Sequence, residues 1–191
     1  MGKKALIVVD GQNDFIEGGS LPVNGAKDAM NRLAEYIKNN YKEYSSIVFT
    51  VDWHPQTHCS FKANGGQWPT HCVQFSHGAA IYQPLLDVLD ENKIDYTVLT
   101  KGTDEDREEY SIFKNPMSKI ILGRHYENDK YETVDFAGIA LDYCLKNSAL
   151  DSKKVFIKSE IRVLIDFCPS IGKPEYTIKE LEDNNIEIIK N

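Results

Sequence analysis

Four segments of this chain each place a reactive or ionisable side chain at the end of an apolar run. Asp10 follows ALIVV, Asp52 and His54 follow SIVFTV, Lys101 follows DYTVLT, and Cys144 comes shortly after ETVDFAGIA. The carboxyl ends of parallel strands share one edge of a sheet, where open α/β sheets bind ligands, so these segments are expected to meet in one pocket. A thiol, a carboxylate, an amine and an Asp-x-His pair suit the hydrolysis of an amide through a thioester.

Cys144 is the candidate nucleophile of this set. It is expected at the start of a helix, where the helix dipole and free backbone N–H groups favour a thiolate and can receive an oxyanion. Asp10 can take the proton of the thiol and pass it to a leaving amine, while Lys101 holds that carboxylate charged and oriented. Each residue alone has an ordinary interpretation: Cys144 as a small buried hydrophobe, Asp10 as a loop cap and Lys101 as a surface amine. Their convergence favours catalysis.

A candidate metal site begins with the Asp-x-His pair. Side chains two residues apart on an extended segment point to the same side, so Asp52 and His54 can bind one ion, and the loop that follows can bring His71 to it. Three N/O ligands with positions left for water suit a catalytic Zn²⁺, Fe²⁺ or Mn²⁺. The alternative is that these histidines only form hydrogen bonds within the loop. His58 is a weaker fourth candidate, which is expected to support the metal ligands from behind or to brace the loop.

The elements that must position these residues follow from the hydrophobic pattern. Strands are expected at 4–9, 45–51, 95–101, 132–139, 162–167 and 186–190, and helices at 25–44, 84–92, 118–129, 141–159 and 174–185. This alternation predicts a single-domain, three-layer αβα fold with a mostly parallel, doubly wound sheet of about six strands. Residues 53–77 form a long loop, which is typical of a functional segment. The acidic segment 102–116 is expected to be a solvated loop.

Composition limits the classes of function. The length of 191 residues suits one domain over residues 1–191. A net charge of −7 without a basic block argues against nucleic-acid binding. No apolar run approaches the roughly 20 residues of a membrane helix and no signal-peptide pattern is present, so a cytoplasmic enzyme without a membrane partner is expected. The cysteines lack C-x-x-C spacing, which favours reduced thiols at Cys59, Cys72, Cys144 and Cys168.

Five segments between about residues 5 and 152 carry a family resemblance. They are VDGQNDFIEGGSLPV, TVDWHPQTHCSF, WPTHCVQFSHGA, TKGTDEDREEYSIF and AGIALDYCLKNSALD. In this order they resemble the successive motifs of the nicotinamidases, the pyrazinamidase-type members of the isochorismatase-like cysteine hydrolases. The set is specific because the segments are separate and all carry residues of the family pattern.

The resemblance implies a role for each matching residue. It implies a catalytic set and a metal-ligand set, which are Asp10, Lys101 and Cys144, and Asp52, His54 and His71. It also implies substrate-binding aromatic residues and an oxyanion hole, which are Phe15, Trp68 and Tyr110, and the N–H groups of Ala140 and Cys144. A cis peptide between Ile139 and Ala140 belongs to the same pattern.

The activity implied is the conversion of nicotinamide to nicotinate and ammonia through a cysteine thioester, in NAD salvage, with pyrazinamide as a further substrate. One divalent ion is implied, Zn²⁺ in the first place and Fe²⁺ or Mn²⁺ as alternatives, and many family members form homo-oligomers. Two other interpretations stay open: a non-catalytic metal- or ligand-binding relative, and another metal-assisted cysteine amidase of the superfamily. An isochorismatase proper uses no cysteine nucleophile, and N-carbamoyl amidases lack the metal set.

Three departures from the family pattern stand out. Leu141 takes the place of the usual threonine before Asp142, and Glu108 and Glu109 replace the usual Asp-Ser before Tyr110. From about residue 153 onward, the chain resembles the family only in its rhythm of strand, helix and strand.

Overall fold

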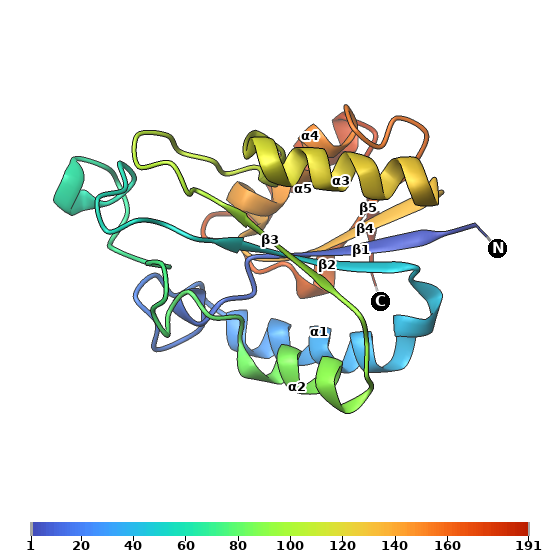
Figure 1. Ribbon diagram of the computed structural model, residues 1–191, viewed down its shortest axis with the longest axis horizontal. Helices are drawn as coiled ribbons and strands as arrows, with labels where there is room; N and C mark the ends of the chain where they lie inside the picture. Colours follow the sequence, from blue (N-terminus) through green and yellow to red (C-terminus); the bar gives the residue numbers. More distant parts are fainter. Residues whose placement is uncertain (1, 191) are drawn as a thin grey trace.

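Six parallel strands form the centre of the computed structural model, which describes residues 2–190 (Figure 1). In chain order they are β1 (Lys4–Val9), β2 (Ser46–Asp52), β3 (Thr97–Lys101), β4 (Thr133–Gly138), β5 (Glu160–Leu164) and β6 (Glu187–Ile189). Their spatial order is β3-β2-β1-β4-β5-β6, and every neighbouring pair is parallel. The doubly wound sheet expected from the sequence is confirmed, and the strand order reverses between β1 and β4.

Helices cover both faces of the sheet (Figure 1). One face carries α1 (Ala26–Asn40) and α2 (Gln83–Glu91), and the other carries α3 (Pro116–Asp129), α4 (Lys146–Ser152) and α5 (Pro174–Asp183). Among residues 2–190, no helix is long and apolar enough to cross a membrane.

The central strands β1, β2 and β4 are buried along almost their whole length because both of their faces are covered. In β1, Leu6 and Val8 join the core on the α1 and α2 side, whereas Ile7 and Val9 join the core on the α3 side. All six residues of β4 are buried. This burial fixes the positions of the strand ends, from which the polar site residues extend.

The helix expected at 141–159 is much shorter than the sequence suggests. A π-helical turn, Leu141–Leu145, leads into α4, which ends at Ser152. The Ser152 hydroxyl donates to the Ala149 carbonyl at 2.6 Å, and the chain then turns so that Phe156 is buried. The Phe156 ring packs against Phe113, with 5.6 Å between the ring centroids. If the helix continued past Ser152, the position of Phe156 would follow from the helical register and not from its contact with Phe113.

The acidic segment 102–116 is solvated only in part. Residues 103–107 are exposed, as expected, but Glu109 is fully buried and Ile112 and Phe113 belong to the core beside α3. A 3₁₀ turn, Ile112–Lys114, carries the two hydrophobic residues. The second half of the segment therefore packs into the core instead of lying in solvent.

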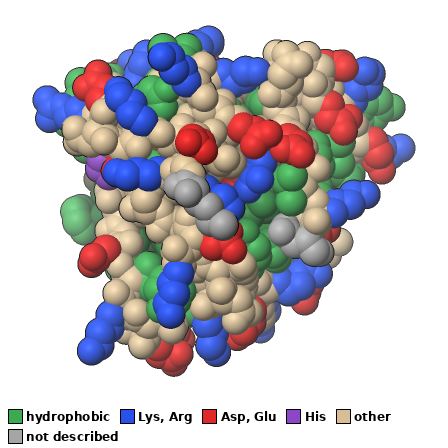
Figure 2. Space-filling model, turned by 90° about the vertical axis from the view of Figure 1, so that its right-hand side faces the viewer, with side chains coloured by type: hydrophobic (Ala, Val, Ile, Leu, Met, Phe, Trp, Pro, Cys, Tyr) green, Lys and Arg blue, Asp and Glu red, His purple; other side chains and the backbone are tan. Residues whose placement is uncertain are grey.

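The amino-terminal edge of the sheet, opposite the site residues, carries acidic and basic side chains that are intermixed (Figure 2). Lys3 pairs with Asp129 at 2.6 Å and Lys4 with Glu43 at 2.9 Å. These pairs are largely solvated, so each contributes less than about 1 kcal/mol to stability. They connect the start of β1 to the end of α3 and to the turn after α1.

Candidate active site

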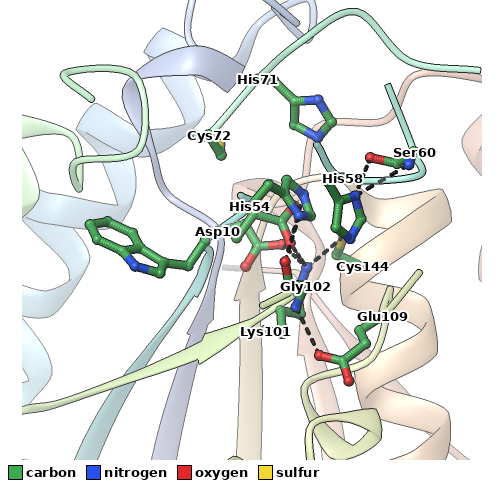
Figure 3. Close-up of polar contacts among 12 residues, drawn as sticks. Asp10, His54, His58, Ser60, His71, Cys72, Lys101, Gly102, Glu109 and Cys144 are labelled. Atoms are coloured by element: carbon green, nitrogen blue, oxygen red, sulfur yellow. Dashed lines mark hydrogen bonds and ion pairs between the residues drawn. The ribbon is translucent and has the colours of Figure 1, made fainter. Parts of the chain in front are cut away.

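The residues expected to meet lie together at the carboxyl edge of the sheet, beside the point where the strand order reverses (Figure 3). Asp10 directly follows β1, and Asp52 and Lys101 are paired neighbours at the ends of β2 and β3. Cys144 lies in the π-helical turn after β4. All four are buried, and Asp10 and Lys101 are completely shielded from solvent.

Lys101 connects the other three side chains. Its ammonium lies 2.8 Å from Asp10 Oδ2, 2.5 Å from Asp52 Oδ1 and 3.2 Å from Cys144 Sγ. The Thr50 hydroxyl donates to the other Asp10 oxygen at 2.8 Å. A buried cation needs close counter-charges, and the two carboxylates provide them. A carboxylate oxygen of Asp10 also lies within 4.8 Å of the Cys144 sulfur, which is near enough for a short proton path.

The enclosed position determines how these groups ionise. Burial raises the pKa of Asp10 to about 6, although the Lys101 charge opposes this shift. Burial also raises the pKa of the Cys144 thiol, and the lowering effect of Lys101 only partly offsets it. Burial disfavours the Lys101 ammonium, but Asp10 and Asp52 outweigh that cost and raise its pKa. The sequence alone favours a thiolate at the helix start. In the folded protein, burial instead keeps the Cys144 thiol protonated beside Asp10, whose carboxylate titrates near neutrality.

Asp52, His54 and His71 form a candidate metal site. One ligand atom from each lies within 4.8 Å of the others, and all three side chains are buried. His54 Nδ1 donates to the Gly102 carbonyl at 2.9 Å, and His71 Nδ1 donates to the Pro69 carbonyl at 2.8 Å. A carbonyl only accepts, so both rings carry their proton on Nδ1 and leave the Nε2 lone pair for a metal. The donor set therefore fits a divalent ion.

His58 braces the loop, as the sequence suggests. Its Nδ1 accepts from the Ser60 N–H at 3.2 Å, and its Nε2 donates to the Arg107 carbonyl at 3.2 Å. Its ring stacks on His54, with 4.0 Å between centroids. Burial, followed by the nearby His54, lowers the pKa of His58 to about 4. Both ring nitrogens are engaged, so neither is free for a metal.

A mostly apolar cavity lies beside Cys144. Phe15, Trp68 and Tyr110 line it, together with the metal-site residue His71. The Phe15 and His71 rings are 5.7 Å apart between centroids. The Trp68 indole N–H donates to the Tyr110 hydroxyl at 3.1 Å, which fixes the two rings relative to each other. The aromatic residues expected at the pocket thus share one cavity with the candidate nucleophile and with two of the candidate metal ligands, Asp52 and His71.

The peptide between Ile139 and Ala140 is cis, as the family resemblance implies. The Ala140 carbonyl accepts from the N–H groups of Tyr143 and Leu145, and this anchors the turn that carries Cys144. Ala140 lines the cavity beside Cys144, and its N–H has no acceptor among residues 2–190. This N–H is therefore available to a ligand oxygen.

Sequence reasoning missed several residues that build the site. Tyr143 lines the cavity and packs edge-on against Trp68, with 5.0 Å between centroids. Gln12 is buried and clamps the end of β2: its amide accepts from the Asp52 N–H and donates to the Asp52 carbonyl, both at 2.8 Å. The signal for Gln12 is its place in the DGQND segment, two residues after Asp10.

Ile171 reaches the cavity from the C-terminal part of the chain, where the sequence carries no motif. The Asp142 carboxylate holds this segment, since it accepts from the N–H groups of Ile171 at 3.0 Å and Gly172 at 2.7 Å. The contact links the turn that carries Cys144 to the segment after β5, and no local pattern predicts it.

A family model described as the Isochorismatase domain matches residues 4–154, so this chain belongs to that family. The nicotinamidase of Saccharomyces cerevisiae is 30% identical over an alignment 217 residues long, gaps included, which covers 97% of this chain and 99% of the relative. The crystal structure of Pyrococcus horikoshii pyrazinamidase in complex with zinc matches with a TM-score of 0.84 at 32% identity and covers 99% of each chain. The yeast nicotinamidase bound to the inhibitor nicotinaldehyde matches with a TM-score of 0.85 at 28% identity, over 98% of this chain and all of that one.

Proposed function

We propose that this chain is a nicotinamide amidohydrolase, which converts nicotinamide to nicotinate and ammonia in NAD salvage. The observation that carries the proposal is the Lys101 ammonium, which contacts both Asp10 and Cys144 beneath an aromatic cavity. A thiol beside a carboxylate of raised pKa suits cleavage of an amide, because the leaving amine must be protonated. Similarity to a nicotinamidase and to a pyrazinamidase over nearly the whole chain supports the same reaction.

The cavity suits a flat pyridine ring. Phe15 and Trp68 would flank the ring, and Tyr110 would complete the wall. Asp52, His54 and His71 would hold one divalent ion, for which Zn²⁺ is our first choice and Fe²⁺ or Mn²⁺ are alternatives. When bound, that ion would supply a Lewis acid that attracts the ring nitrogen. Pyrazinamide has the same shape and carboxamide, so we expect it to be a second substrate.

The residues around the carboxamide divide the chemistry among themselves. Cys144 loses its proton to Asp10 as the sulfur attacks the amide carbon, and the N–H groups of Ala140 and Cys144 receive the negative oxygen. Asp10 returns that proton to the nitrogen as the C–N bond breaks, which releases ammonia and leaves a thioester. Asp10 then takes a proton from the water that attacks the thioester carbon and returns it to the sulfur as the C–S bond breaks, which restores the Cys144 thiol. Nicotinic acid leaves and gives up its proton to solvent as nicotinate. Lys101 holds the Asp10 carboxylate in place throughout.

A substrate panel tests the proposal. Purified protein is offered nicotinamide, pyrazinamide, benzamide, an N-carbamoyl amino acid and isochorismate, and ammonia or acid product is measured. We expect turnover of the first two, much poorer turnover of benzamide because it lacks the ring nitrogen, and little reaction with the others. Chelation should weaken nicotinamide turnover, and added Zn²⁺, Fe²⁺ or Mn²⁺ should restore it. Inactivity toward every amide would favour a non-catalytic ligand-binding relative.

A further inference from the structure

We propose that Glu109 is a positioning residue for the metal site, which acts on His54 through the backbone of Gly102. The inference rests on the metal site of the proposed function, but not on the substrate. Glu109 is one of the two acidic residues that depart from the family pattern at this point of the chain. It lies in a segment whose neighbouring residues 103–107 are exposed, yet its own side chain is fully buried.

Gly102 is held on both of its backbone polar groups (Figure 3). Its N–H donates to Glu109 Oε2 at 2.8 Å, and its carbonyl accepts from His54 Nδ1 at 2.9 Å. The His54 ring also packs directly against Gly102, since a Cβ added there would lie 2.3 Å from the ring carbon Cε1. The φ angle of +64° suits glycine for the same position. A displacement of Gly102 would therefore move or rotate the His54 ring.

Glu109 is itself fixed from two further directions. Asn115 Nδ2 donates to Glu109 Oε2 at 3.2 Å, and the Arg107 guanidinium lies 2.8 Å from Glu109 Oε1. Asn115 caps α3, because its side chain accepts from the Ser118 N–H at 3.1 Å. The carboxylate thus ties Gly102 to the rigid start of a helix. A buried carboxylate is costly unless several donors surround it, and here the donors converge on the oxygen that holds Gly102.

The effect on the metal site follows from the bond at Nδ1. A hydrogen bond at the ring nitrogen opposite to the ligating one fixes the tautomer and orientation of a histidine ligand, and its loss typically lowers metal affinity about 10- to 100-fold. Glu109 contacts none of Asp52, His54 and His71 with its own side chain. Its hydrogen bond to the Gly102 N–H is therefore the contact through which it can position the His54 ring.

The test compares Zn²⁺ affinities of metal-free protein by competition with a chromophoric chelator, together with thermal unfolding of the same samples. Glu109→Ala should lower the affinity about 10-fold or more. Glu109→Gln should keep it within about 3-fold, since the amide oxygen can still accept from Gly102. The control is Glu105→Ala, which removes an exposed carboxylate of the same loop that contacts Thr57 instead of Gly102. It should bind Zn²⁺ as the parent does.

Metal affinity separates a positioning role from a structural one, which would lower the unfolding temperature and leave the affinity unchanged. Parental affinity in Glu109→Ala, with binding lost in His54→Ala, would overturn the inference and leave the proposed function intact. An equal loss in Glu109→Gln and Glu109→Ala would also overturn the hydrogen-bond account. If Glu109→Ala does not fold, Glu109→Met, which keeps the length of the side chain but has no accepting oxygen, must show the same loss. A parent protein that binds none of Zn²⁺, Fe²⁺ and Mn²⁺ would overturn this inference and the metal site of the proposed function, whereas metal binding without nicotinamide turnover would overturn only the proposed reaction.

Discussion

Lys101 is the residue on which the electrostatics of the site depend, because one buried ammonium faces two carboxylates and a thiol. Replacement by an uncharged side chain of similar length would leave Asp10 and Asp52 as close, buried and unpaired charges. Lys101→Met should therefore lose nearly all turnover and about 3 to 5 kcal/mol of unfolding free energy. Ammonia release and urea unfolding measure the two effects. Parental turnover in this variant would show that the amine is not needed.

Asp10 should determine the acid limb of the pH profile. Burial raises its pKa to about 6, and only its ionised form can accept the proton of Cys144. The value of kcat/KM should thus be maintained above about pH 6 and fall about tenfold per pH unit below it. The initial rate of ammonia release at low substrate concentration gives the profile. Asp10→Asn should remove turnover at every pH, and an unchanged rate down to pH 4 would contradict this role.

At the scale of elements, Asp142 joins the turn that carries Cys144 to the segment that carries Ile171. Asp142→Ala removes two hydrogen bonds to a charged acceptor and should loosen the Ile171 wall of the cavity. We expect the KM for nicotinamide to rise about 5- to 30-fold, with a smaller effect on kcat. Glu180→Ala is the matched control, because it removes a more exposed carboxylate that pairs with Lys146. A fall in kcat alone would assign Asp142 to the chemical step instead.

Sequence patterns predict elements where one local signal dominates. Apolar runs predict the strands and the carboxyl-edge positions of Asp10, Asp52 and Lys101, because the residue pattern of a buried or half-buried strand is local. The end of α4 at Ser152 depends on the burial of Phe156 against Phe113, a contact between distant segments. The burial of Glu109 likewise depends on donors at Gly102 and Asn115, and its acidic neighbours suggest only a solvated loop.

The whole molecule brings the candidate metal ligands together only when it is folded. Asp52 ends β2, whereas His71 returns from the loop that follows, so the unfolded chain has no such site. Zn²⁺ added to metal-free protein should stabilise it by about 2.7 kcal/mol at a hundredfold excess over Kd. Differential scanning fluorimetry would show the shift, and His54→Ala should abolish it. The same shift in both proteins would place the ion elsewhere.

The fold positions the cavity where the strand order reverses, but the roles of the side chains depend on one covalent step at Cys144. Hydroxylamine competes with water for a thioester, so the parent protein turning over nicotinamide should form nicotinohydroxamate as well as nicotinate. Chromatography of the products of the parent and of Cys144→Ala, run side by side, tests that step. We expect hydroxamate from the parent and a loss of both products by at least about 10³-fold in Cys144→Ala, with the fold retained. Parental ammonia release by Cys144→Ala would contradict the thioester route.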